Sequence, residues 1–340
     1  HKYLPFGPLP AILLVPFLWL LNAGVPLVVL GYVLTTANVA LFLPICRRLG
    51  NPAAHSAWLS LLYFGGTVYL PVALVGISTF FAHIVATTFL LLAILEILGK
   101  RRMLLAGLFL GLAATARMSV AFTLPFFIWL AIEPVLPADQ RTGQKFRQSR
   151  IANTAVLLLG VAIPVGLYLW YNFARFGNAL ESGFALAALY TPALEEARSV
   201  GLFSLAHVPK NLFNMLVALP SAVRSSGSGA LEFPYLKPSP WGMGVFFCSP
   251  ALLYLFRAPL RDRLVQACWV GIACTLTPIL AYYGIGFVQF GYRYALDFMP
   301  LIILLVARGT SGKTTPAFKA LTTASVLINI WGAVYLAVWL

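Results

Sequence analysis

Residues 81–117 read FAHIVATTFLLLAILEILGKRRMLLAGLFLGLAATAR. Two apolar runs lie on either side of a short basic turn, Lys100 to Arg102. A helix that crosses a bilayer needs about 20 mostly apolar residues, and the first run reaches that length. The stretch therefore predicts a helical hairpin in a membrane, with its basic turn in water.

The composition of the whole chain agrees with this hairpin. Hydrophobic residues make up 61% of the 340 residues and charged residues only 9%, whereas soluble domains carry about 25% charged residues. We expect an all-α polytopic membrane protein, with residues 1–340 forming a single transmembrane domain of about ten transmembrane helices. The expected spans are 25–46, 57–76, 79–98, 103–116, 119–133, 152–171, 243–256, 265–283, 294–307 and 320–339.

Basic residues predict the orientation of these spans. Alternate loops carry 15 of the 23 lysines and arginines: Arg47, Arg48, Lys100, Arg101, Arg102, Arg141, Lys145, Arg147, Arg150, Arg257, Arg261, Arg263, Arg308, Lys313 and Lys319. The positive-inside rule places these loops in the cytoplasm, so both ends of the chain are expected outside. The net charge of +14 is mostly this orientation signal, which argues against nucleic-acid binding.

Three segments differ from simple spans. Residues 1–24 predict an outward-facing helix at the membrane interface, and 134–150 predict a cytoplasmic loop. The outer loop 172–242 is long for a compact protein, and Pro209 is placed to begin an amphipathic helix within it. The expected apolar face of that helix contains Leu212, Phe213, Leu216 and Leu219. This loop either covers a site at the membrane surface or is an inert extracellular loop.

Small residues predict packing rather than chemistry at two places. Gly107 and Gly111 form a GxxxG pair that lets two helix backbones approach closely. The four cysteines show no metal-ligand spacing with the histidines, and we expect them to be small buried hydrophobes. The sequence therefore predicts neither a metal site nor a cofactor.

The basic residues on the expected outer side are not explained by topology. Arg117 ends the GLAATAR stretch and Arg293 lies in FGYRYALDFMP. Each of these two arginines either extends its side chain to lipid headgroups or helps to hold an anionic group. The second role is suggested because a guanidinium group matches a phosphate bidentately. Tyr292 and Tyr294 are placed to flank such a group, although tyrosine is also common at membrane interfaces. Arg175 lies just after a predicted span and is a further candidate for donor-phosphate binding.

Two other polar residues lie near the same boundary. His83 is expected one turn into a span from the outer side, as a packing residue or as a weak candidate for catalysis. Asp297 follows Arg293 by four residues, about one helical turn, and is expected either to pair with Arg293 or to act directly.

Several motifs, in this order, resemble those of GT-C membrane glycosyltransferases. They are KYLPFGPLPAILLVP (2–16), FGGTVYLPVALVGISTFFAHIVA (64–86), LLAGLFLGLAATARMSVAFTLPFF (104–127), YNFARFGNALESGF (171–184) and GYRYALDFMPL (291–301). The chain is most similar to bacterial relatives of the dolichyl-phosphate-mannose protein mannosyltransferases and the lipid A aminoarabinose transferases. The resemblance implies a multi-pass protein of the cell inner (plasma) membrane with its site on the outer face.

The same resemblance implies the reaction and the partners. The expected donor is a polyprenyl-phosphate-linked sugar in the lipid bilayer, and the acceptor is a glycan, a lipid or a protein. Basic residues, here Arg117 and Arg293, hold the donor phosphate in an inverting transfer. The family's principal aspartate lies in a first outer loop, which we expect upstream of His1. Some members have an acidic residue where this chain has His83.

Two other functions remain open from the sequence. A transporter or flippase would use the same arginines along a path for an anionic lipid, and it would show broken helices in two related halves. A family-like membrane protein without catalytic activity would serve as an assembly partner. The identity of the sugar is not encoded in any of these motifs.

Overall fold

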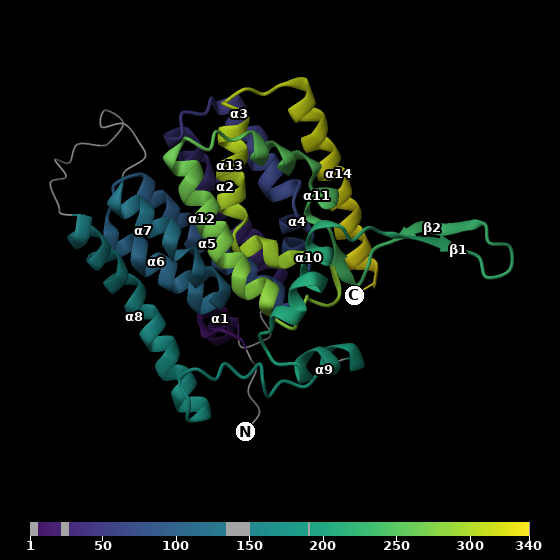
Figure 1. Ribbon diagram of the computed structural model, residues 1–340, viewed down its shortest axis with the longest axis horizontal. Helices are drawn as coiled ribbons and strands as arrows, with labels where there is room; N and C mark the ends of the chain where they lie inside the picture. The colour runs from purple at the N-terminus through teal and green to yellow at the C-terminus, as the bar shows by residue number, and fades with distance from the viewer. Residues whose placement is uncertain (1–5, 22–26, 134–149, 190, 340) are drawn as a thin grey trace.

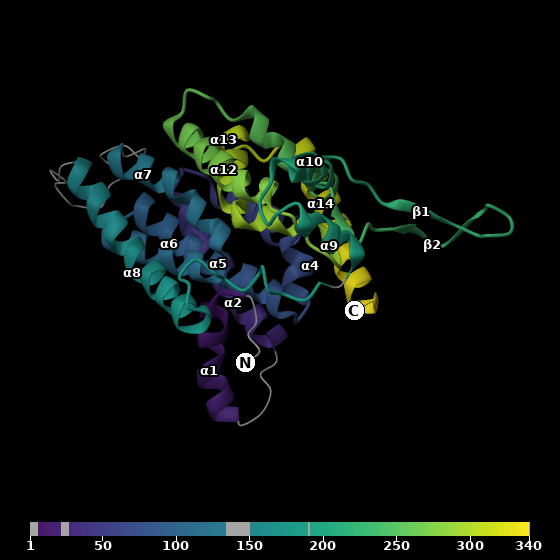
Figure 2. The ribbon, with the colours of Figure 1, turned by 60° about the horizontal axis from the view of Figure 1, so that its bottom comes forward.

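The computed structural model describes residues 6–21, 27–133, 150–189 and 191–339. The expected cytoplasmic loop 134–150 lies outside them except for Arg150, and so do both ends of the expected interfacial segment 1–24. Within that segment, α1 (Pro8–Leu21) confirms the expected helix. Figure 2 shows α1 extending away from the helical bundle, next to the N-terminal end of the chain.

Five long apolar helices form the frame of the molecule (Figure 1). They are α2 (Leu27–Arg48), α5 (Ser78–Leu98), α8 (Arg150–Phe176), α12 (Arg263–Ala281) and α14 (Pro316–Trp339). Each is long and apolar enough to cross a membrane. In α5, 78% of the most apolar stretch is buried, whereas the other four expose more than half of theirs. Helix α5 is therefore central, and the other four present apolar faces outward.

The other five expected spans are short or broken, so the structure does not confirm ten spans. The region expected to hold them contains α3 (Ala53–Ser60), the π-helix η1 (Leu61–Gly65), α4 (Tyr69–Leu74), α6 (Met103–Ala116), the 3-10 helix η2 (Met118–Thr123), α7 (Leu124–Ile132), α11 (Val245–Cys248), and the 3-10 helices η5 (Pro250–Arg257) and η6 (Arg293–Asp297), followed by α13 (Met299–Gly309). Proline begins α7 and α13, because it fits the first turn of a helix and interrupts one that precedes it.

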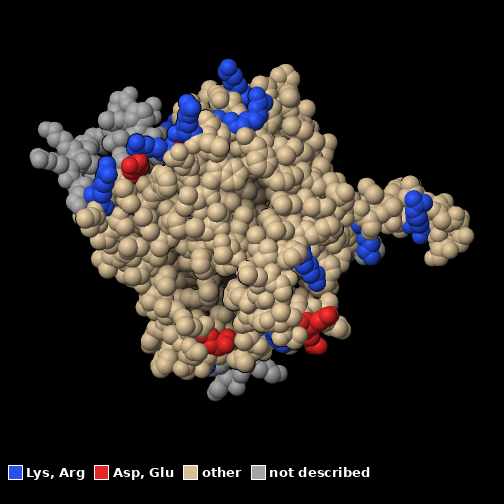
Figure 3. Space-filling view, in the orientation of Figure 1, with Lys and Arg blue, Asp and Glu red and all other residues tan. Residues whose placement is uncertain are grey.

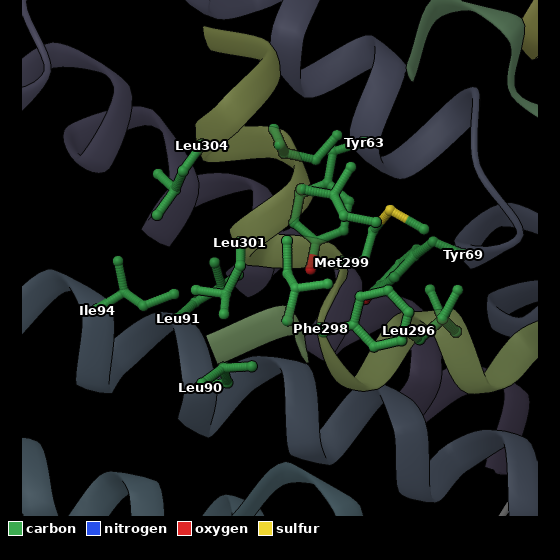
Figure 4. Close-up of a cluster of buried hydrophobic side chains, with 14 of the residues drawn as sticks. Tyr63, Tyr69, Leu90, Leu91, Ile94, Leu296, Phe298, Met299, Leu301 and Leu304 are labelled. Carbon is green, nitrogen blue, oxygen red and sulfur yellow. The ribbon is translucent and has the colours of Figure 1, made fainter. Parts of the chain in front are cut away.

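The core lies between α5, α13 and the broken segment η1–α4. Figure 4 shows Tyr63 and Tyr69 beside the first residues of α13, with Leu91 of α5 on the other side. Tyr63, Tyr69, Leu91, Met299 and Leu301 are all almost completely buried. Packing at this density fixes the position of α13, and with it the position of η6, which directly precedes α13.

The predicted glycine contact is confirmed between α6 and α8. A Cβ atom on Gly107 would stand 2.1 Å from the carbonyl oxygen of Leu157, and one on Gly160 would stand 2.4 Å from the carbonyl oxygen of Leu104. A Cβ atom on Gly111 would stand 2.8 Å from the carbonyl oxygen of Val161. The two backbones therefore touch along more than one turn, as small residues permit in membrane helices.

Where they are described, the loops that carry the expected orientation signal meet at one end of the bundle, which we call the basic end. Arg308 pairs with Asp262 at 3.2 Å and Arg263 pairs with Glu133 at 2.7 Å. Arg48, at the end of α2, donates to the carbonyl oxygen of Leu95 near the end of α5. In Figure 3, lysines and arginines gather along the upper part of the visible face, with others on the hairpin.

The long segment 172–242 is only partly helical. It contains α9 (Pro192–Ser199), the short 3-10 helix η4 (Leu205–His207), α10 (Val208–Leu216) and the antiparallel hairpin of β1 (Ser221–Arg224) and β2 (Leu231–Lys237). The expected helix after Pro209 is confirmed as α10, but the hairpin was not expected. Strand β3 (Trp241–Met243) pairs in parallel with β4 (Gln289–Gly291). These strands are short, and the mostly helical fold is consistent with the expected all-α membrane protein.

Candidate functional site

Three chain segments converge at the end of the bundle opposite the basic end. The last residues of α5 lie at the basic end, so its first residues lie at this opposite end. Helix α6 runs back from the basic end and reaches the same place at Arg117. The third segment is η6, which precedes α13. Gly7 packs on the last turn of α6, since a Cβ atom there would stand 2.0 Å from the carbonyl oxygen of Thr115. Gly7, in the second half of the KYLPFGPLP motif, therefore borders the place where these segments meet.

Asp297 is the centre of this site, and its carboxylate accepts four hydrogen bonds. Arg117 donates from Nη2 to Oδ2 at 2.9 Å and from Nε to Oδ1 at 3.2 Å. His83 Nδ1 lies 3.1 Å from Oδ1, and the hydroxyl of Ser119 donates to Oδ2. We call these four residues the Asp297 cluster. Donors on both oxygens stabilise the charged form of a carboxylate, so Asp297 is an ionised structural centre.

The sequence-based pairing of Asp297 with Arg293 is wrong, and the local geometry explains why. In an α-helix, residues four apart lie on one face. The segment Arg293–Asp297 is instead a 3-10 helix, where three residues complete a turn and the fourth residue points elsewhere. Asp297 therefore faces Arg117 rather than Arg293.

Arg293 is buried, with only 9% of its surface exposed. Its Nη1 donates to Gln289 Oε1 at 2.8 Å and to the carbonyl oxygen of Phe287 at 3.4 Å. Its Nε is buried and has no hydrogen-bond partner among the described residues. In the part of the chain that the structure describes, no carboxylate lies within ion-pair distance of this guanidinium. Arg293 is thus a buried cation held by neutral acceptors.

An aromatic ring connects the two arginines. The guanidinium carbons of Arg117 and Arg293 each lie 5.2 Å from the ring centre of Tyr294, and Phe80 lies 5.5 Å from Arg293. The structure thus brings together the two arginines that sequence analysis singled out. The interaction of a cation with a ring face offsets part of the cost of burying a guanidinium.

Tyr292 has a different position from the one expected. Its side chain is completely buried, and its hydroxyl donates to Asn211 Oδ1 at 3.2 Å. Asn211 also donates to the carbonyl oxygens of Leu280 and Tyr282. Tyr292 therefore fastens α10 to the bundle next to the site, while Tyr294 contacts the arginines.

His83 is oriented by Asp297. A carboxylate can only accept, so the 3.1 Å contact requires His83 to donate from Nδ1. In the neutral form of the ring, Nε2 then carries a lone pair. The Nε2 atom is buried and has no hydrogen-bond partner among the described residues. The ring lies 6.3 Å from that of Tyr294, centre to centre. His83 is therefore held by Asp297 through Nδ1, while its buried Nε2 is left for another partner.

Arg175 takes a different role from Arg117 and Arg293. It lies at the end of α8, where its guanidinium carbon is 4.6 Å from the ring centres of both Tyr171 and Phe176. These are rings of its own helix rather than Tyr294. Conversely, sequence analysis missed Ser119 and Gln289. Their signal was only proximity in sequence, two residues after Arg117 and four before Arg293.

Comparisons with known proteins add no relative. No family model matches the chain, and searches of curated proteins and of solved structures give no match either. Among the described residues, no group of three His, Cys, Asp or Glu side chains is placed to hold a metal ion. Among the described residues, the site has one arginine paired with Asp297, one arginine without a carboxylate partner, and the imidazole of His83 beside Asp297.

Proposed function

We propose that this chain is a GT-C-type membrane glycosyltransferase. It would move a sugar from a polyprenyl-phosphate-linked donor to an acceptor at the outer face of the cell inner (plasma) membrane. The observation that carries the proposal is the burial of Arg293 without a carboxylate partner among the described residues. A buried cation is costly unless it is paired, and a phosphate would supply the missing charge with matching geometry.

The arrangement of the two arginines supports a division of roles. Arg117 is neutralised and fixed by Asp297, so its charge is already compensated. Arg293 contacts the same Tyr294 ring, and its charge has no carboxylate partner among the described residues. The donor phosphate is therefore expected to bind Arg293, while Arg117 stays paired with Asp297 next to it. Donors held in place before reaction stabilise charge that develops in the transition state.

In the proposed reaction the acceptor hydroxyl oxygen forms a bond to the anomeric carbon of the sugar. The bond between that carbon and the phosphate oxygen breaks, and its electron pair stays on the polyprenyl phosphate. The configuration at the anomeric carbon inverts. Arg293 neutralises the charge that grows on the departing phosphate, and a general base takes the proton from the acceptor hydroxyl.

Two groups are candidates for that base. Asp297 is not one of them, because both of its oxygens already accept hydrogen bonds. His83 is a candidate because Asp297 holds its Nδ1–H and leaves Nε2 with a lone pair. The other is the carboxylate that the family resemblance implies outside the described residues.

The test is release of polyprenyl phosphate by the full chain in proteoliposomes. Radiolabelled polyprenyl-phosphate mannose and polyprenyl-phosphate aminoarabinose serve as donors, with membrane lipid and glycan extracts as acceptors. Arg293→Ala should lower release about 100-fold, the usual effect of removing one charge-stabilising donor. Arg293→Lys should restore part of the rate, because it returns the charge without the bidentate geometry.

Arg257→Ala is the matched control. Its guanidinium carbon lies 5.3 Å from the ring centre of Tyr254, at the basic end, so it removes a stacked arginine away from the site. Release at the unchanged rate by Arg293→Ala would remove this residue from the site. Passage of intact donor across the bilayer without release would replace the glycosyltransferase with a transporter.

A further inference from the structure

Helix α10 is turned with its polar face toward the protein. Asn211, Asn214 and Met215 are buried, whereas Phe213 is 56% exposed and Leu216 44% exposed. The buried side chain of Asn211 points toward the bundle, where it donates to the carbonyl oxygens of Leu280 and Tyr282 at the end of α12. A helix in contact with water would show the opposite arrangement. The outer face of α10 is therefore suited to an apolar environment.

The hairpin that follows α10 also exposes apolar side chains, and it lies further from the bundle. Figures 1 and 2 show β1 and β2 projecting away from the helices. Four large apolar side chains on β2 are at least 46% exposed: Leu231, Phe233, Tyr235 and Leu236. An isolated two-stranded hairpin is at best marginally stable in water, so these side chains need a partner that covers them.

The apolar surface continues onto a helix of the bundle. In Figure 1 the hairpin leaves the molecule beside the C-terminal half of α14. That helix exposes Leu327, Ile330, Val334 and Val338 by 45% or more, as expected of a helix that faces lipid. An exposed apolar patch of this extent marks an interaction site. Its continuity with α14 indicates the same partner, the acyl region of a bilayer.

The charged side chains of residues 203–241 indicate which lipid headgroups this surface would contact. Residues 203–241 contain three basic side chains, Lys210, Arg224 and Lys237, and one acidic side chain, Glu232. Both Arg224 and Lys237 are exposed, Arg224 next to the turn at the tip of the hairpin and Lys237 at its base. Basic residues beside an apolar face that lies in the interface favour anionic headgroups.

We propose that α10 and the β1–β2 hairpin form a membrane-seated paddle in the outer leaflet. Phe213, Leu216 and Phe233 enter the boundary between headgroups and acyl chains, and Arg224 and Lys237 bind phosphates of anionic phospholipids. Because Tyr292 joins α10 to η6 through Asn211, the paddle sets the height of the Arg293 site relative to the leaflet. This inference depends on the chain lying in a membrane and not on the transfer of a sugar.

The test is the depth of a fluorescent label in nanodiscs. The four free cysteines are replaced by alanine in the full chain, and single cysteines are introduced by Phe233→Cys or Leu236→Cys. An environment-sensitive dye on either site should be quenched at least twofold by lipids with a nitroxide near the headgroup, and little by aqueous iodide. Two sites keep the test valid if one variant does not fold.

The matched control is Glu195→Cys, an exposed site on α9 in the same long segment. Its label should be quenched by iodide and not by the nitroxide lipid. A second arm combines Arg224→Ala and Lys237→Ala with the Phe233 label. With Arg224 and Lys237 in place, quenching by the nitroxide lipid should differ between discs with and without anionic phospholipid. In the double variant it should be the same in both.

Two results would overturn the paddle. One is strong quenching by iodide at both hairpin sites, which would place the hairpin in water. The other is energy transfer between hairpin labels on two copies of the chain in one disc. If its efficiency did not change with lipid composition, the partner of the hairpin would be a second copy. Neither readout depends on donor turnover, so failure here and failure of the glycosyltransferase proposal are distinguishable.

Discussion

The two ends of the bundle use the same residue types in opposite ways. At the basic end every ion pair reaches solvent. The side chain of Arg102 is 50% exposed in its pair with Glu96 and that of Arg263 is 61% exposed in its pair with Glu133, while Arg308 and Asp262 are each 26% exposed. At the opposite end, Asp297 is 1% exposed and Arg293 is buried. An exposed pair contributes little to stability, whereas a buried charge determines what surrounds it.

This difference indicates that the basic end orients the chain in the membrane and that the opposite end binds a ligand. The basic end meets the requirement for orienting a chain in a membrane, which depends on the number of lysines and arginines and not on their geometry. The opposite end depends on geometry, since the Asp297 cluster neutralises Arg117 and leaves Arg293 uncompensated. The predictions below test whether the two ends differ in this way.

The largest expected effect is on stability when the buried acid is removed. Asp297→Ala leaves Arg117 and Arg293 close together with no carboxylate, and loss of one partner of a buried pair costs about 3–5 kcal/mol. Glu133→Ala, at the basic end, should cost less than about 1 kcal/mol. Denaturant unfolding in detergent measures both, and equal costs would erase the distinction between the ends.

A smaller effect is expected along the helix that joins the two ends. Gly107→Ala places a Cβ atom 2.1 Å from the carbonyl oxygen of Leu157, and such overpacking costs about 1–3 kcal/mol. Gly166→Ala, on α8, is the control, because nothing lies within 4 Å of its Cβ position. That variant should be neutral or more stable, since alanine is the better helix former. Thermal unfolding compares them, and a stable Gly107→Ala would contradict the close contact.

Within the Asp297 cluster, Ser119→Ala removes one of four hydrogen bonds to the carboxylate. The expected loss of unfolding free energy is about 1–3 kcal/mol, the range for a bond to a charged group. Ser199→Ala is the control, since its hydroxyl bonds to a backbone carbonyl at an exposed position. A Ser119→Ala variant as stable as the control would show that the hydroxyl adds nothing to the cluster.

The smallest effect is expected for the exposed pair of Arg102 and Glu96. Arg102→Ala should cost less than about 1 kcal/mol, and the difference from the unchanged chain should shrink as salt is added. Unfolding at low and high ionic strength gives both values. A cost above that range, independent of salt, would mean that the basic end also depends on specific pairs.

Hydropathy predicted the helices that stand alone and failed where proline divides an apolar run. The five long helices, α1 and α10 fall where apolar length and Pro209 placed them. The runs 119–133 and 294–307 look continuous in hydropathy, but a 3-10 turn followed by proline splits each of them. Such a break depends on local backbone hydrogen bonding, which an average over apolar residues does not record.

The two arginines of the site were predictable from the sequence, but their partners were not. Subtracting the orientation loops identified Arg117 and Arg293, and the structure places both against Tyr294. The partner of Asp297 was predicted from α-helical spacing and is wrong because η6 is a 3-10 helix. The inward turn of α10 was also not predictable, since an amphipathic pattern does not say which face meets protein and which meets lipid.

The most direct test of the central claim is phosphate binding by Arg293. Polyprenyl phosphate, without a sugar, is titrated into the full chain in detergent, and the shift in thermal unfolding temperature gives its affinity. The unchanged chain and Arg257→Ala should bind with equal affinity, and Arg293→Ala should bind at least tenfold more weakly. Equal affinity for Arg293→Ala would contradict the assignment of the buried, uncompensated guanidinium as the anion site.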